Sequence, residues 1–213
     1  FPLEQSSSSQ QSKPMTNNDV LRRIRYTFNF NDKTMIQLFA EAGHTVTREQ
    51  VSDWLKKDDD PAYQDCSDVE LAIFLNGLIN LKRGKREGPQ PEPEQRLSNN
   101  IIFMKLKIAL NLQADDILEI MNRSDFRLSK HELSAFFRKS SHKHFRKCQD
   151  QVLRHFLKGL QATYRTDTDS SDDQEHRGDA TTPDLAPVET TSTQKAAATV
   201  EPEVESVWRR KKP

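Results

Sequence analysis

The amino-acid sequence predicts an all-α protein built from two tandem, pseudo-equivalent modules of about four helices each, followed by a disordered C-terminal tail. The chain repeats itself at a fixed interval, and apolar residues recur at helical spacing in both copies of the repeat. Residues 166–213 hold almost no large apolar side chains. A segment of that composition cannot bury enough surface to offset the entropy of an ordered chain.

The repeat becomes visible when residues 17–78 are placed on residues 99–160, at an offset of 82 that needs no gap. Positions that differ often exchange one apolar residue for another, as Trp54 does with Phe136. Twelve positions are identical, and in first-copy numbers they are Asn17, Asn18, Asn29, Ser52, Lys57, Cys66, Asp68, Leu71, Phe74, Leu75, Gly77 and Leu78. Because the apolar positions match throughout without an insertion, we infer that the chain arose by duplication.

The first two helices of the first copy are expected between residues 17 and 42. Asn17 and Asn18 are candidate N-caps for the first helix, since asparagine is a preferred residue there. The second helix is expected from about Asp32 to Ala42 and stops at Gly43, a residue typical of the position after a helix. The apolar stripe of the first helix consists of Val20, Leu21, Ile24 and Phe28.

The third and fourth helices follow the same logic in both copies. Thr47 with Gln50, and Ser129 with Glu132, form capping-box patterns that open the third helix of each copy. The fourth helix of the first copy is expected from about Asp68 to Lys82, with a broad apolar face. A polar loop precedes it.

Five segments follow from these patterns. Residues 15–83 form the first helical repeat and residues 99–165 the second. Residues 84–98 form a proline-rich linker that cannot be helical throughout. Residues 1–14 are expected to be disordered and to lie ahead of a native start at Met15, and residues 166–213 form a disordered acidic tail.

The formal charge of zero conceals an uneven distribution. Residues 15–165 carry 25 basic and 20 acidic side chains, whereas residues 166–213 carry 6 and 11. Cys66 and Cys148 occupy equivalent positions in the two copies, which indicates small buried apolar residues rather than a disulfide. Free cysteines favour a reducing compartment.

Several stretches also resemble a known family. They read NNDVLRRIRYTF, VSDWLKKDDDPAYQDCSD and FLNGLINLKRGK in the first copy, and NNIIFMKLKIAL in the second. These stretches and the duplicated layout, over about residues 15–165, resemble the bacterial YehS-like family, a domain of unknown function. The resemblance implies a cytoplasmic bacterial protein and brings no activity, cofactor or site with it.

The segment Thr34–Leu55 has two interpretations, a DNA-binding helix-turn-helix and an ordinary packed helical hairpin. Its turn is about two residues longer than usual, and its second helix carries Glu49 and Asp53, which phosphates would repel. In the second copy Asp125 replaces Gly43. The packed hairpin is the favoured interpretation, because amphipathic helices must pack on something.

The loop before the fourth helix has opposite charge in the two copies. The second-copy loop and its flank offer Arg138, Lys139, Lys143, His144, Arg146 and Lys147 as contacts for nucleic acid or another partner. The first-copy loop offers an acidic interface of Asp58, Asp59, Asp60 and Asp65. The two loops could be complementary interface patches, or solvated loops that diverged after duplication.

Motifs for catalysis or metal binding are not apparent. The sequence holds no glycine-rich phosphate loop and no nucleophile elbow. His142, His144 and Cys148 are residue types that can ligate a metal, but Cys148 recurs as Cys66 in a copy without nearby histidine. We therefore expect no enzyme, no metal and no cofactor.

The leading functional hypothesis is a non-enzymatic cytoplasmic interaction or adaptor protein, with regulatory use and an unknown protein partner. The alternative is a nucleic-acid-binding protein that uses the basic face of the second repeat, with helix-turn-helix-like hairpins. No membrane association is expected, because no apolar run approaches the length of a membrane span. Nucleic-acid binding predicts one continuous basic surface, whereas an adaptor predicts an exposed apolar patch.

Overall fold

The computed structural model describes residues 13–165, and these residues contain helices and no strand. The first repeat holds α1 (Asn17–Thr27), α2 (Asp32–Glu41), α3 (Arg48–Leu55) and α4 (Asp68–Arg83). The second repeat holds α5 (Asn99–Ala109), α6 (Ala114–Asn122), α7 (Lys130–Phe136) and α8 (Asp150–Tyr164). Each repeat has four helices in the same order, which confirms the predicted all-α fold of two equivalent modules. The tail predicted for residues 166–213 lies outside the described residues, as do residues 1–12.

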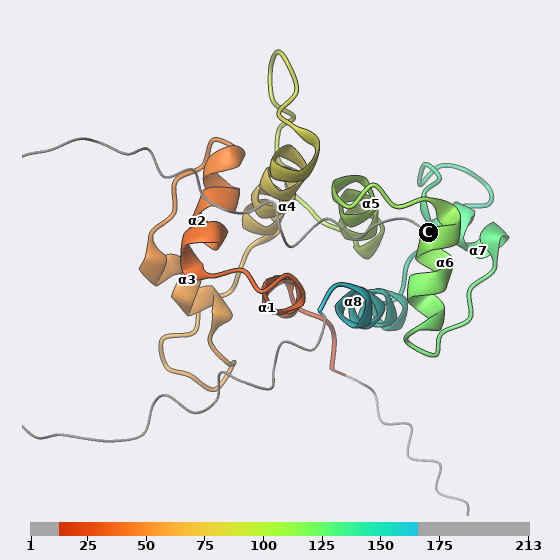
Figure 1. Cartoon of the computed structure of the whole chain (residues 1–213), viewed down its shortest axis with the longest axis horizontal. Helices are drawn as coiled ribbons and strands as arrows, with labels where there is room; N and C mark the ends of the chain where they lie inside the picture. The colour runs from red at the N-terminus through yellow and green to blue at the C-terminus, as the bar shows by residue number, and fades with distance from the viewer. Residues whose placement is uncertain (1–12, 166–213) are drawn as a thin grey trace, which may run out of the picture. The chain divides into compact units, whose positions relative to one another are not determined.

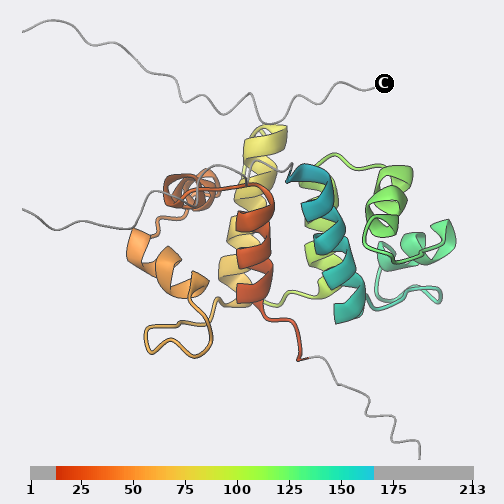
Figure 2. The ribbon, with the colours of Figure 1, turned by 60° about the horizontal axis from the view of Figure 1, so that its bottom comes forward.

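The first and fourth helices of both repeats pack together at the centre. Figures 1 and 2 show α4 beside α5 and α1 beside α8, with the α2–α3 and α6–α7 pairs on the two outer sides. Because α5 is the equivalent of α1 and α8 of α4, the two contacts are reciprocal, as in a two-fold dimer. Within residues 13–165 no helix is both long and apolar enough to cross a membrane.

The N-caps differ from those predicted. Thr16 and Ser98, each one residue earlier than expected, accept hydrogen bonds from the backbone N–H groups of Asp19 and Ile101. The prediction that Asn17 and Asn18 are caps is wrong, since both lie inside α1. Their amide groups are instead engaged in contacts with the distant loop before α4, which a local capping pattern does not reveal.

Asn18 uses both the nitrogen and the oxygen of its side-chain amide to hold that loop against α1. Its side-chain nitrogen donates to the carbonyl oxygens of Trp54 and Gln64, at 2.9 and 2.8 Å. Its side-chain oxygen accepts from the backbone N–H of Cys66 at 3.0 Å. Asn100 repeats the arrangement on the equivalent residues of the second repeat, Phe136, Arg146 and Cys148. Both asparagines are buried.

The preceding asparagine of each repeat orients an aspartate that joins the repeats. Asn17 donates to Asp68 at 2.8 Å, and Asn99 donates to Asp150 at 2.7 Å. The second oxygen of Asp68 accepts from the backbone N–H of Leu97, just before α5, at 2.9 Å. Asp150 accepts in the same way from Met15, just before α1, at 2.9 Å. Each fourth helix therefore anchors the chain entering the other repeat.

Two glycines allow the second helix of each repeat to approach the fourth closely. A Cβ atom added to Gly77 in α4 would overlap the carbonyl oxygen of Leu38 in α2. A Cβ atom on Gly159 in α8 would overlap the carbonyl oxygen of Ile120 in α6. The glycine identical in both copies is therefore explained by backbone contact rather than by a turn.

The linker is held to the central helices by a buried lysine. Lys105 of α5 is 7% exposed and pairs with Glu94 of the linker at 2.9 Å, and its ammonium group also donates to Asn76 of α4. A buried ammonium group requires such partners, because burial without them is very costly. The interaction ties residues 84–98 to both repeats.

The two cysteines are buried and free. Burial raises the pKa of each thiol to about 12. Both residues lie just before the fourth helix, and the backbone N–H of each donates to the asparagine that holds the loop. This confirms the prediction that they are small core residues and not a disulfide.

Replacing Asn18 by alanine should lower the free energy of unfolding by about 3 kcal/mol or more, since two carbonyl oxygens and one N–H would lose their partner in the interior. Urea unfolding of the two proteins measures the difference. Asn122→Ala serves as the control, because that exposed side chain forms no hydrogen bond within residues 13–165. Equal midpoints for the two variants would contradict the proposed importance of Asn18.

Replacing Asp150 by asparagine should lower stability by about 1 kcal/mol at pH 7, with the difference shrinking below about pH 4. The hydrogen bond from Met15, followed by that from Asn99, lowers the pKa of Asp150 in the folded protein. Stability from a lowered carboxyl pKa is present above the unfolded pKa and is lost as pH falls through the folded pKa. Urea unfolding at several pH values measures this, with exposed Asp59→Asn as the control. A difference independent of pH would contradict the assignment.

Candidate functional site

The loop between α7 and α8, residues 138–149, carries all six residues predicted to contact nucleic acid or another partner. Two interactions fix its backbone beside α7. Asn100 donates to the carbonyl oxygen of Arg146 at 2.9 Å. The N–H of Arg146 donates to the carbonyl oxygen of Ala135 in α7 at 3.2 Å. The loop is therefore positioned by the core of the second repeat, although most of its side chains are exposed.

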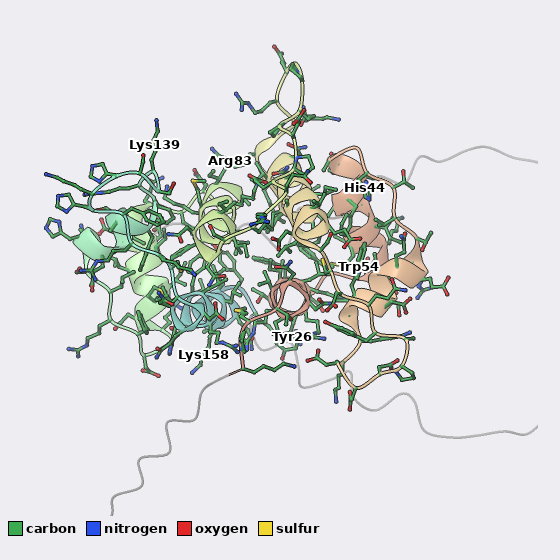
Figure 3. The ribbon with its side chains drawn as sticks, turned by 180° about the vertical axis from the view of Figure 1, so that it is seen from behind. Tyr26, His44, Trp54, Arg83, Lys139 and Lys158 are labelled. Carbon is green, nitrogen blue, oxygen red and sulfur yellow. The ribbon has the colours of Figure 1, made fainter. Side chains whose placement is uncertain are left out.

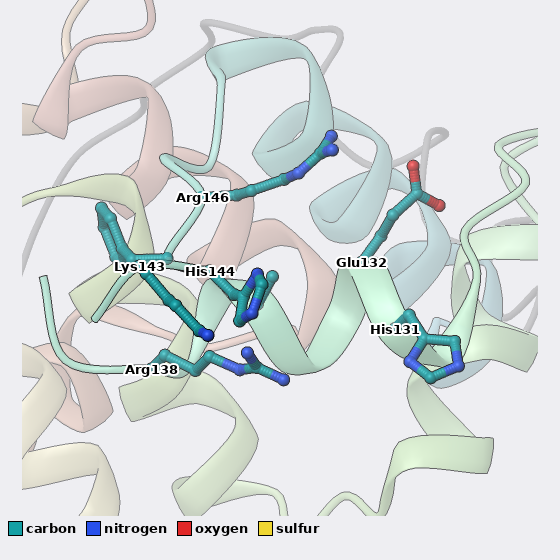
Figure 4. A pocket seen from close by; sticks show the side chains of 8 residues that line it. His131, Glu132, Arg138, Lys143, His144 and Arg146 are labelled. Atoms are coloured by element: carbon teal, nitrogen blue, oxygen red, sulfur yellow. The ribbon is translucent and has the colours of Figure 1, made fainter.

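Between this loop and α7 lies a cleft of about 440 Å³, called the basic cleft below. Its lining residues come from α7 and from the loop that follows it. They are His131, Glu132, Ala135, Arg138, Lys143, His144, Phe145 and Arg146. Figure 4 shows Arg138, Lys143 and His144 pointing toward one another, with Arg146 extending separately on the side of Glu132.

The cations of the basic cleft have no carboxylate partners within residues 13–165. Arg138, Lys143 and Arg146 form no ion pair there. Glu132 is the one acid in the lining, and it accepts hydrogen bonds from the backbone N–H and the hydroxyl of Ser129 at 3.0 and 2.7 Å. These bonds lower the pKa of Glu132. Its carboxylate caps α7, and the other charges of the cleft are positive.

The equivalent place in the first repeat is neutralised by local pairs. Asp53 stands where the second repeat has Ala135, and it pairs with Lys56, the equivalent of Arg138, at 2.6 Å. Pro61, Ala62 and Gln64 replace the loop cations Lys143, His144 and Arg146. The two repeats therefore share a backbone arrangement and differ in the charge displayed on it.

Two members of the predicted basic set lie outside the basic cleft. Lys147 lines an adjoining groove of about 390 Å³, which shares Glu132 and Arg146 with the basic cleft. Lys139 lines neither hollow and projects outward from the loop (Figure 3). The structure therefore brings four of the six predicted residues, Arg138, Lys143, His144 and Arg146, into one cleft.

His131 belongs to the basic cleft and is not among the predicted residues. It lies one helical turn before Ala135 on α7, so the two share a helix face. Its equivalent in the first repeat is Glu49, so this position also loses an acidic side chain in the second repeat. A comparison of the two copies that includes α7, and not only the loop, identifies it.

The predicted acidic interface is used largely within its own repeat. Asp58 pairs with Arg22 at 3.5 Å and also with Lys13. Asp60 caps the N–H of Ala62 at 2.9 Å, and Asp65 accepts from the hydroxyl of Tyr63 at 2.9 Å. Asp59 is exposed and forms no such bond within the described residues.

The acidic and basic loops do not face each other within this molecule. Figure 1 shows the α3–α4 loop and the α7–α8 loop on opposite sides of the four central helices. The idea that the two loops are complementary patches in one molecule is therefore wrong. Pairing of the two loops would need a second molecule.

The outer helix pairs differ from a DNA-binding helix-turn-helix in their turns. The connections are residues 42–47 in the first repeat and residues 123–129 in the second, longer than the usual three or four residues. Gly43 and Asp125 both adopt positive φ, at 76° and 59°, so the second repeat keeps the turn without glycine. Packed helical hairpins describe both pairs.

Metal-ligating residues do not cluster in the part of the chain that the structure describes: no group of three His, Cys, Asp or Glu side chains could hold an ion there. His142 and His144 have ring centroids 5.6 Å apart, while Cys148 is buried beside Asn100. Among residues 13–165 the exposed large apolar side chains are Tyr26, Met104 and Ile108. Tyr26 is covered in part by Arg165, whose guanidinium lies 3.4 Å from the ring centroid.

Comparison with known proteins places the chain in a family. Its sequence matches the family described as "Protein of unknown function (DUF1456)" twice, at residues 17–84 and 99–166. It is 46% identical over 149 residues to the "Uncharacterized protein YehS" of Escherichia coli strain K12, a match covering 70% of this chain and 96% of that protein. No solved structure matches. The resemblance to YehS noted from the sequence is thereby confirmed, and the chain belongs to the DUF1456 family, in which the domain occurs here twice.

Proposed function

We propose that the protein is a non-catalytic nucleic-acid-binding protein and that the basic cleft of its second repeat contacts the phosphate backbone. The observation that carries the proposal is one concave surface lined by Arg138, Lys143 and Arg146, which form no ion pair with a carboxylate of residues 13–165. Arg and Lys side chains that neutralise phosphates favour binding because they release the counterions condensed on the nucleic acid.

The distribution of charge supports the same assignment. Residues 99–165 hold 13 basic and 6 acidic side chains, whereas residues 15–83 hold 9 and 11. At the place of the cleft, the first repeat has the ion pair between Asp53 and Lys56, whereas the second repeat has Ala135 and Arg138 at the same two positions. If three or four cleft cations contact phosphates, the logarithm of the binding constant should fall against the logarithm of salt concentration with a slope of about −3.

An adaptor role, the leading hypothesis from the sequence, has less support in the described residues. An adaptor would be expected to display a contiguous apolar patch. Met104 and Ile108 lie one turn apart on α5 and are exposed, but together they form a small surface. An adaptor could still use the basic cleft to bind an acidic partner protein. The polyglutamate titration described below would detect such binding.

Changing Lys143 and Arg146 together to glutamate should strongly weaken the salt-sensitive binding of the full chain to nucleic acid. Fluorescence anisotropy with labelled DNA and RNA of mixed sequence, at about 50, 100 and 200 mM salt, measures it. A loss of about a hundred-fold at the lowest salt concentration is expected for reversing two phosphate contacts.

The matched control is Lys85→Glu with Arg86→Glu, which makes the same charge change on exposed linker residues. Equal losses in the two variants would indicate a diffuse charge effect and would contradict a site in the basic cleft. Failure of the unaltered protein to bind nucleic acid at the lowest salt concentration would overturn the proposed function. Binding of polyglutamate with equal affinity would favour an acidic protein partner instead.

Replacing Ala135 by aspartate should weaken binding about ten-fold while leaving the fold in place. The substitution supplies the carboxylate that Asp53 provides in the first repeat, where it pairs with Lys56 at 2.6 Å. The new carboxylate would pair with Arg138 and repel phosphate. The same anisotropy titration measures the affinity, and circular dichroism checks the helices. Unchanged affinity in a folded variant would exclude Arg138 as a phosphate contact.

A further inference from the structure

We propose that the nucleic acid is single-stranded, with its phosphates in the basic cleft and an unpaired base in the adjoining groove. This inference rests on the proposed function and specifies its substrate class. It is carried by the relation between the two hollows, which share Glu132 and Arg146 and differ in their lining.

The adjoining groove has an apolar floor and a basic rim. Phe126, Leu128, Phe136 and Val152 supply the apolar surface, and Arg127 and Lys147 join Arg146 at the edge. Phe126 is half-buried and its ring stacks on that of His155, with centroids 4.7 Å apart and an angle of 34° between the planes. The ring of His155 is oriented in turn by the carbonyl oxygen of Ser124 at 3.0 Å. The Phe126 ring is therefore supported from within the second repeat by His155.

A basic cleft beside an apolar, aromatic groove is the arrangement by which proteins bind single-stranded nucleic acid. Proteins that bind single-stranded nucleic acid join a positive groove that follows the backbone to aromatic side chains on which bases stack. Arg146 lies between the two hollows and can contact the phosphate that precedes a base in the groove. The first repeat lacks the combination, since Arg127, Arg146 and Lys147 correspond to Thr45, Gln64 and Asp65.

A duplex fits this surface poorly. Its bases are stacked inside, so an apolar groove would have nothing to receive. The helix that would read a major groove is α7, seven residues long, and its exposed Glu132 lies between the two hollows.

The test compares four probes of equal length on the full chain at about 50 mM salt: a deoxythymidine strand, a uridine strand, a DNA duplex and an abasic DNA strand. We expect both single strands to bind at least about ten-fold more tightly than the duplex. The abasic strand, which keeps the phosphates and lacks the bases, should bind at least about five-fold more weakly than the thymidine strand, since stacking of one base accounts for a loss of that size.

Phe126→Leu keeps the groove apolar and removes the aromatic ring. It should weaken the binding of the thymidine strand and leave the affinity for the abasic strand unchanged. Tyr26→Leu is the matched control, because Tyr26 is an exposed aromatic residue in the first repeat. Equal binding of abasic and thymidine strands would overturn the inference while the proposed function stands, as would a duplex that binds as tightly as a single strand. If none of the four probes binds, the proposed function fails and the inference fails with it. The abasic comparison uses the unaltered protein, so the test holds even if Phe126→Leu does not fold.

Discussion

In each repeat, one buried asparagine uses its whole side-chain amide to hold the loop before the fourth helix against the first helix. Asn18 and Asn100 each make three hydrogen bonds to backbone groups that would otherwise be buried without partners. The carbonyl groups they bind belong to the end of the third helix and to the loop itself. One side chain therefore sets the relative position of three segments, and the rest of the repeat is built around it.

The same interaction leaves the loop side chains free to vary. Because Asn100 binds the backbone of Arg146 and not its side chain, the chemistry at that position can change without loss of the fold. The first repeat has Gln64 there, held through the same carbonyl oxygen. Duplication thus provides two copies of one scaffold. In the first copy three of the four loop aspartates, Asp58, Asp60 and Asp65, bind neighbouring groups. In the second copy the loop cations line a cleft.

The reciprocal packing of the repeats explains why the two share a single set of central helices. Asp68 binds the chain that enters α5, and Asp150 binds the chain that enters α1. The ring of Phe28 at the end of α1 lies 5.5 Å from that of Tyr164 at the end of α8. The outer helix pairs, where the basic cleft lies, are therefore attached to a common core.

Much of the fold follows from periodicity and capping patterns, and the exceptions have a single physical cause. Thr47 with Gln50 and Ser129 with Glu132 open helices as predicted, because a capping box is a local interaction between residues three apart. A local pattern misassigns Asn17 and Asn18 because their partners lie 36 to 51 residues away. The charge of the cleft could be predicted by comparing the two loops. The change in charge at His131 could be predicted as well, by extending that comparison to α7. The two hollows themselves could not, since they depend on how α7 packs beside the loop.

The proposed nucleic-acid site lies in the second repeat and has no counterpart in the first. Both proposals, binding to the basic cleft and binding of a base in the adjoining groove, depend on this difference between the two repeats. Hydrogen–deuterium exchange of the full chain, with and without a saturating single-stranded oligonucleotide, tests it without any substitution. We expect slower exchange across residues 126–147 and unchanged exchange across the equivalent residues 44–65. Equal slowing in both segments, or slowing confined to residues 44–65, would contradict it.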